Sequence, residues 1–189
     1  MTYLWRIPET NSDGLIGTYL RSNGLDRFEL RKGKRIKVNE AMPTVQFDER
    51  THCLLAFDCL SNTAVPLISQ RLGQVLLDIC AQDVQLVPAR IEAADGVLDG
   101  WSLLNAIATV RAINHSKSVY TMVPGTQAIM GFRHLELLED CLVGHQIARD
   151  TEYLGHLLVS DSLAQALSDF SGATFERPEE AYHQSMRRR

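Results

Sequence analysis

The chain has 189 residues, 45% of them hydrophobic, which is enough to bury one substantial core and too few for two large domains. Its formal net charge is −4, and apart from a run of three arginines, Arg187–Arg189, its basic residues are dispersed. This balance argues against a nucleic-acid-binding protein, which would carry a basic face. It suits a basic partner instead, since opposite charges accelerate encounter.

Targeting signals and cysteine usage both favour the cytoplasm. No stretch is as long and apolar as a transmembrane helix, and the first residues lack the basic start and apolar run of a signal peptide. The four cysteines form no Cys-x-x-Cys pair, so we expect free thiols, mostly buried. They are Cys53, Cys59, Cys80 and Cys141.

The N-terminal third predicts short strands. Residues 2–7 read as a strand and residues 15–20 as an edge strand, while 45–48 and 53–58 fit strands or packed segments. The basic run 31–35 predicts a solvated hairpin tip.

The middle of the chain predicts a helix followed by a hairpin. The helix runs from Ser69 to about Cys80, and strands at 84–92 and 101–113 bracket an Asp-Gly turn within 95–100. Asn105 interrupts an apolar run, and because an unpaired buried amide is costly, it predicts an internal hydrogen-bonded strap.

The C-terminal part repeats the strand-to-helix pattern. Residues 128–138 favour a strand, and 153–159 lead into a second helix from Ser160 to about Phe170. From Glu179 the chain is polar and predicts a frayed or partly helical tail.

One motif occurs twice, as Leu67–Leu76 and Leu158–Leu167, with five of ten positions identical. In each copy a short apolar strand ends at a serine, Ser69 or Ser160, whose hydroxyl can cap the first turn of the helix that follows. The leucine spacing then places one face of each helix on a core. Both serines are therefore predicted to be structural caps rather than nucleophiles.

The duplicated motif, with Trp101–Ile107, Lys117–Tyr120 and Gly172–Phe175, resembles the eleventh-numbered immunity-protein family of bacterial polymorphic toxin systems, formerly a domain of unknown function. The resemblance covers residues 64–178 and rests on the order and spacing of the pieces. We expect a single α+β domain with a mainly antiparallel sheet and two Ser-capped helices from an internal repeat. Residues 1–63 would be a strand-rich part of the same fold, and 179–189 a polar tail.

The resemblance implies a cytoplasmic immunity protein that binds and neutralises a cognate toxin without turnover or cofactor. The implied toxin is a nuclease, of the HNH-like type often found beside this family, delivered by a type VI or similar secretion system. Inhibition would occlude or distort the toxin's active site. No direct contact with nucleic acid or membrane is expected.

Acidic residues gather in two places, and either cluster can imitate nucleic-acid phosphate in a basic substrate groove. One is the hairpin with Glu92, Asp95 and Asp99. We favour the other, because it departs most from the repeat and has apolar neighbours to serve as anchors. The candidate toxin contacts are Glu136, Glu139, Asp140, Leu142, Val143, Ile147, Asp150 and Glu152.

Two other classes of function remain open. The six histidines never fall at metal-ligand spacing, so no metal site is predicted, and catalytic motifs are lacking. An enzyme using His115, Ser116 and Lys117 would need a pocket that joins them to a carboxylate. A nucleic-acid or adaptor module using the 31–35 turn and the arginine tail would need a continuous basic stripe.

Overall fold

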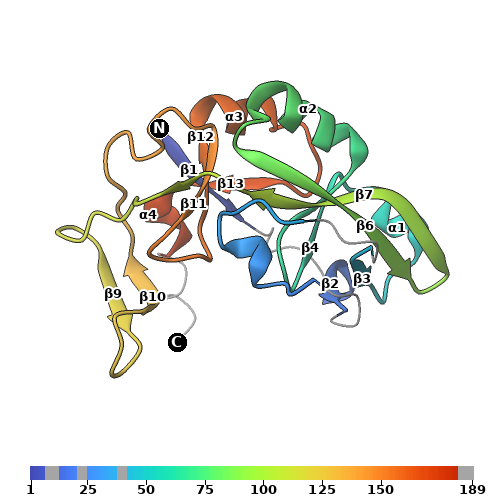
Figure 1. Cartoon of the computed structure of the whole chain (residues 1–189), viewed down its shortest axis with the longest axis horizontal. Coiled ribbons are helices and arrows are strands. Elements are labelled where there is room, and N and C mark those ends of the chain that lie inside the picture. The colour runs from blue at the N-terminus through green and yellow to red at the C-terminus, as the bar shows by residue number, and fades with distance from the viewer. Residues whose placement is uncertain (7–12, 21–24, 38–41, 183–189) are drawn as a thin grey trace.

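The computed structural model describes residues 1–6, 13–20, 25–37 and 42–182 (Figure 1). Across these residues no helix combines the length and the apolar character needed to cross a membrane. All four cysteines are free thiols, and three of them are buried.

Six strands close into a barrel in the order β2-β3-β6-β7-β5-β4. They are β2 (Ile16–Tyr19), β3 (Thr44–Gln46), β4 (Cys59–Asn62), β5 (Leu67–Ile68), β6 (Val84–Ala93) and β7 (Gly96–Ala106). Aliphatic and aromatic side chains such as Val45, Leu60 and Leu103 fill the barrel. The prediction that 15–20 is an edge strand is wrong, because closure pairs β2 with β3 on one side and β4 on the other.

A five-stranded sheet lies beside the barrel in the order β13-β1-β12-β11-β8. Its strands are β1 (Thr2–Arg6), β8 (Thr109–Val110), β11 (Ile147–Asp150), β12 (Leu157–Ser160) and β13 (Thr174–Glu176). A separate antiparallel pair, β9 (Val119–Met122) and β10 (Ile129–His134), projects from the end of the molecule opposite the tip of the β6–β7 hairpin (Figure 1).

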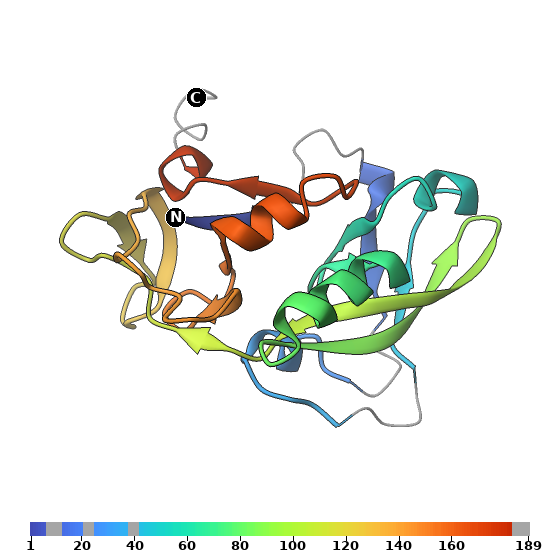
Figure 2. The same cartoon turned by 90° about the horizontal axis from the view of Figure 1, so that it is seen from above.

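Short helices surround the strands. They are the 3-10 helices η1 (Asp13–Leu15) and η3 (Glu29–Arg31) and the α-helices α1 (Thr51–Leu54), α2 (Gln70–Cys80), α3 (Asp161–Ala166) and α4 (Pro178–Ala181). Figure 2 shows α2 and α3 side by side, α2 over the barrel and α3 over the five-stranded sheet. Leu72 of α2 and Leu163 of α3 belong to one buried cluster with strands of both sheets. The chain is therefore a single α+β domain with mainly antiparallel sheets.

The predicted middle segment agrees with the structure except at its ends. The helix from 70 to 80 and the hairpin are present, but the turn is Ala94-Asp95, and β7 begins at Gly96, five residues before the predicted start at 101. Strand β7 stops at Ala106 instead of continuing to 113, because the N–H groups of Ile107 and Ala108 donate to Asp83 O. Asn105 is fully buried, and its amide nitrogen donates to Lys34 O at 2.9 Å and to Gln85 Oε1 at 3.0 Å, as expected of an internally bonded residue; its Oδ1 has no partner among the described residues.

Other boundaries differ. Residues 51–54 form the short helix α1, which overlaps the start of the segment 53–58 predicted as a strand or packed segment. Helix α3 ends at Ala166, four residues before the predicted end, and a short helix, α4, occupies the start of the predicted tail.

The two serine-containing units have the same local geometry. Ser69 Oγ accepts a hydrogen bond from Leu72 N–H at 3.2 Å, and Ser160 Oγ accepts one from Leu163 N–H at 3.1 Å. Each serine also donates its own N–H to the carbonyl of the residue before the partner strand, Asp58 before β4 in one unit and Gln146 before β11 in the other. Each hydroxyl bonds to the side chain of that same residue.

Replacing either serine with alanine is expected to lower the free energy of unfolding by about 0.5 to 2 kcal/mol, because the helix loses its cap. Urea unfolding of the Ser69→Ala and Ser160→Ala variants measures this cost. Unchanged stability in both variants would contradict the capping role.

Asp83 ties the barrel to the five-stranded sheet. It follows α2 and precedes β6, and its side chain is completely buried. One carboxylate oxygen contacts His145 Nδ1 at 2.7 Å, and the other accepts the N–H of Gln146 at 2.7 Å, just before β11. One side chain thus fixes the start of β11 relative to the barrel.

Candidate interaction face and polar network

Three of the predicted carboxylates gather in the loop that follows β10. Glu139 and Asp140 are exposed, and Glu136 is partly buried, with an ion pair to Lys117 at 2.6 Å. This loop and the start of α4, with Glu179, line an open groove. We call residues 136–143 together with Glu179 the acidic loop face.

Val143 stands at the tip of this face in a strained conformation. Its φ is 48°, in the left-handed region that a β-branched residue rarely adopts, and its neighbour Gly144 has a φ of 85°. Val143 is 79% exposed and Leu138 is 45% exposed. Strain of this kind costs about 1 to 3 kcal/mol and clusters at functional positions, so Val143 is a candidate contact residue.

Val143→Gly is expected to raise the free energy of unfolding by about 1 kcal/mol, because glycine adopts the left-handed conformation without the Cβ clash. Val143→Ala is the matched control: it removes the same exposed surface but keeps the clash, so no such gain is expected. Urea unfolding of the two variants gives the comparison. Equal stabilities would contradict strain at this position.

Three of the predicted contacts need correction, because they are not on the surface. Ile147 and Asp150 have no exposed area, since β11 lies between β12 and β8 with core on both faces. Leu142 is 7% exposed and packs in the cluster behind the loop. Glu152 is partly buried and remains at the rim of the polar network described next.

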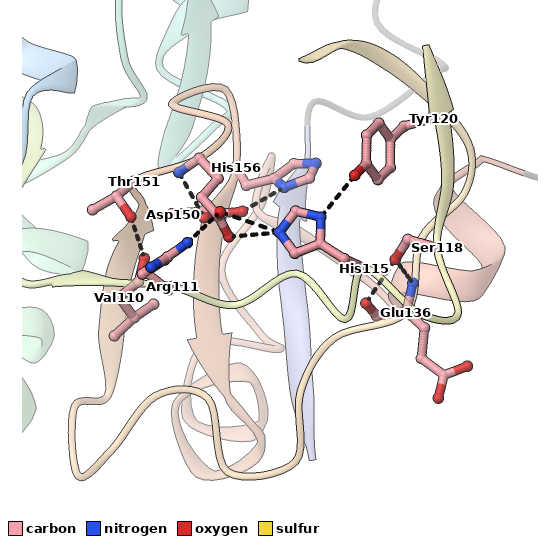
Figure 3. A network of polar contacts seen from close by, with 10 residues as sticks. Val110, Arg111, His115, Ser118, Tyr120, Glu136, Asp150, Thr151 and His156 are labelled. Atoms are coloured by element: carbon pink, nitrogen blue, oxygen red, sulfur yellow. Dashed lines mark hydrogen bonds and ion pairs between the residues drawn. The ribbon is translucent and has the colours of Figure 1, made fainter. Parts of the chain in front are cut away.

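A network of polar side chains connects the loop before β9 with the loop after β11 (Figure 3). His115 Nδ1 lies 2.8 Å from Tyr120 Oη, and His115 Nε2 lies 3.1 Å from Glu152 Oε1. Arg111 also donates to Glu152, at 2.9 Å. Partial burial acts to raise the pKa of Glu152, but the hydrogen bonds from Arg111 and His115 outweigh it and lower that pKa.

A second histidine is buried behind this network. His156 Nδ1 lies 3.4 Å from Asp150 Oδ2, and His156 Nε2 lies 2.7 Å from Tyr182 Oη. Its ring packs 5.1 Å from that of Phe132, which anchors β10 to the sheet. Burial lowers the pKa of His156 despite the nearby Asp150, so the neutral imidazole is the favoured form.

The lowered pKa of His156 predicts acid sensitivity. Above the unfolded-state pKa of about 6.5 the imidazole is neutral in both states, and below it the unfolded chain binds the proton more readily. The free energy of unfolding should therefore fall as pH drops from about 7 to about 5. His156→Gln should show a smaller fall in urea titrations across that range. An equal fall would assign the acid sensitivity to other groups.

An enzyme using His115, Ser116 and Lys117 would need a pocket that joins all three to a carboxylate, and the structure provides this for His115 alone. A groove does join His115 to the Glu152 carboxylate. However, Ser116 Oγ donates to Asn114 and Lys117 pairs with Glu136, so neither side chain completes a constellation with the histidine. His115 and Glu152 are within hydrogen-bond distance, but Ser116 and Lys117 do not join them.

The 31–35 turn is solvated at Lys32, Lys34 and Arg35, as predicted, but it follows the 3-10 helix η3 and is not a hairpin tip. Arg31 ends η3, is partly buried, and donates from Nε to Ala64 O at 2.8 Å. The arginines at 187–189 lie outside the described residues. In the other acidic cluster, Asp95 accepts the N–H of Thr51 at 2.7 Å and Asp99 pairs with Arg90 at 3.3 Å.

Sequence reasoning missed two buried charged residues, Asp83 and Arg149, neither of which sits in a recognisable motif. Among the described residues, no group of three or more His, Cys, Asp and Glu side chains is arranged to hold a metal ion. Comparison with known protein families and with curated proteins found no match to this chain.

Proposed function

We propose that this chain is an immunity protein, which binds a cognate bacterial toxin and neutralises it without chemical turnover. The observation that carries the proposal is the acidic loop face. It joins exposed carboxylates at Glu139 and Asp140 to the strained, exposed apolar tip Val143. An apolar anchor within a charged rim is typical of protein–protein contacts.

The charge of this face favours a basic partner, and a nuclease toxin is the class that fits it. A nuclease binds the phosphates of its substrate in a positively charged groove. Carboxylates at 136, 139 and 140 occupy such a groove as phosphate would, and Val143 adds apolar contact. Occlusion of the groove then blocks substrate entry. The sequence resemblance to an immunity family supports the same conclusion.

Exposed apolar side chains of the β9–β10 pair extend the proposed contact. Val119, Met122 and Met130 are exposed on these strands, and methionine adapts well to binding surfaces. Phe132, on the buried side of β10, packs against Tyr153 at 5.3 Å between ring centres and holds the pair to the sheet. The hairpin is thus an anchored platform rather than a free flap.

Co-purification tests the proposal directly. The tagged full chain is expected to form a one-to-one complex with the toxin domain encoded next to it, with mass measured by light scattering, and to block nuclease activity in proportion to its occupancy. The alternative of an enzyme that uses His115 predicts activity of the chain alone that His115→Ala removes. If the neighbouring toxin neither binds nor is inhibited, the immunity function fails.

We also propose that the two serine-containing units are an internal repeat. Beyond the shared sequence positions, each unit joins an antiparallel strand pair to a helix through the same serine contacts, at Ser69 with Asp58 and at Ser160 with Gln146. The second copy has a shorter helix, six residues against eleven. Ala148 and Leu158 of the second copy belong to the buried cluster that lies behind the acidic loop face.

A further inference from the structure

A cavity of about 140 Å³ lies between the barrel and the five-stranded sheet. Its walls are largely apolar, with Trp5, Leu60, Val65 and Leu157 among the residues that line it, each less than a tenth exposed. Arg149 also lines it, with Arg6 and Arg31. The cavity is separate from the acidic loop face, which lines a different groove.

Strand β11 directs Arg149 toward this cavity. Because successive side chains of a strand point to opposite faces, Ile147 and Arg149 share one face of β11, and Ala148 and Asp150 share the other. Ile147 belongs to the core cluster between the sheets, whereas Ala148 belongs to the cluster behind the acidic loop face. Arg149 therefore faces the barrel.

The Arg149 guanidinium is buried without the partners that such a charge requires. It is 3% exposed, and its Nη1 donates to Leu154 O at 3.2 Å. Within the described part of the chain, neither Nε nor Nη2 has a hydrogen-bond partner. Burial, and then repulsion from Arg31, lower the pKa of Arg149 to about 10, so the group keeps its charge at neutral pH. An unpaired buried charge is costly, and an anion relieves that cost.

The free edge of Arg149 is the edge that binds a carboxylate elsewhere in this protein. Arg71 uses Nε and Nη2 together to hold both carboxylate oxygens of Asp58, at 3.1 and 2.6 Å. Guanidinium and carboxylate match each other in this two-point geometry. Arg31, held by Ala64 O and Thr63 O, adds positive charge at the same cavity.

The volume and the lining of the cavity restrict the class of ligand that fits it. The cavity is comparable to an engineered protein cavity of roughly 150 Å³ that binds benzene. Apolar walls with a few convergent polar groups are typical of small-molecule sites. We propose that this cavity binds a small organic carboxylate, with its carboxylate paired to the Arg149 guanidinium and its apolar body against Trp5, Leu60 and Leu157.

Ligand-induced stabilisation of the full chain tests the proposal, with sodium benzoate, acetate and phosphate compared at constant ionic strength. Benzoate at about ten times its Kd is expected to raise Tm by about 4 °C, acetate less and phosphate least. Arg149→Leu should abolish the rise, whereas Arg133→Leu, at an exposed arginine outside the cavity, should retain it.

A direct binding measurement covers the case in which Arg149→Leu does not fold. The chain has two tryptophans, so a Trp101→Phe variant reports Trp5 fluorescence alone. Saturable quenching by benzoate in this variant supports the proposal. It is overturned if benzoate changes neither Tm nor Trp5 fluorescence, if Arg149→Leu responds like the original chain, or if phosphate stabilises as strongly as benzoate.

Discussion

Reversing Glu136, Glu139 and Asp140 to lysine is expected to abolish protection of cells that co-express the toxin, without unfolding the inhibitor. Glu139 and Asp140 are exposed and Glu136 is partly exposed, so the change costs little packing. Opposite charge steers association, and replacing attraction with repulsion should lower the association rate constant by about 10- to 100-fold. Surface plasmon resonance against the toxin and survival of co-expressing cells measure the two effects.

A second triple variant tests whether the position of the reversed charges or only the net charge of the chain affects binding. Asp48, Asp78 and Asp169 are exposed acidic residues outside both acidic clusters, and their reversal to lysine changes the formal charge by the same amount. This control should slow association only modestly and should keep protection. If both variants protect alike, the contact face lies elsewhere; if both lose protection, net charge is decisive and the local face is not.

The dependence on salt follows from the same charges. Screening shortens the Debye length from about 10 Å at 0.1 M to about 3 Å at 1 M salt. The association rate constant of the unaltered chain should therefore fall as salt rises, while that of the 136, 139 and 140 variant should change little. Dissociation should respond more to Val143→Ala, which removes an apolar contact and leaves the charges in place.

Short sequence patterns correctly predicted the helices and hairpins whose stabilising contacts join residues that are near one another in the sequence. Ser69 followed by regularly spaced leucines specified helix α2, because the cap and the apolar stripe both lie within the helix itself. Asp95-Gly96 indicated the β6–β7 hairpin for the same reason, although the turn itself is Ala94-Asp95. Barrel closure was beyond such patterns, since β2 meets β4 across more than forty residues.

The site was predictable where it depends on exposed charge and not where it depends on burial. Glu139 and Asp140 lie on the surface as their sequence context indicates. Asp150, two residues before Glu152, is fully buried, because a central strand has core on both faces. The same strand buries Arg149, a residue that sequence patterns assign to solvent. Only the position of β11 inside the sheet shows that Arg149 and Asp150 are buried, whereas Glu139 and Asp140 are exposed.

Asp83→Ala is expected to lower the free energy of unfolding by about 3 kcal/mol, the largest single-site loss that we predict. The fully buried carboxylate accepts the N–H of Gln146 and contacts His145, and its removal leaves the backbone donor without a partner. A buried hydrogen bond to a charged group is worth about 1.5 to 3 kcal/mol, and here there are two contacts. The side chain of His145 is partly exposed, at 39%, so water compensates for part of the loss there.

Asp83→Asn is the matched variant, because its amide oxygen can still accept from Gln146 while the negative charge beside His145 is gone. We expect it to cost about half as much as alanine. Urea unfolding in the Trp101→Phe and Trp5→Phe backgrounds follows Trp5, in the five-stranded sheet, and Trp101, in the barrel, and so reports on the two sheets separately. Since Asp83 joins those sheets, the alanine variant should also separate the two transitions. A loss below about 1 kcal/mol with coincident transitions would show that the shared core, rather than this carboxylate, holds the sheets together.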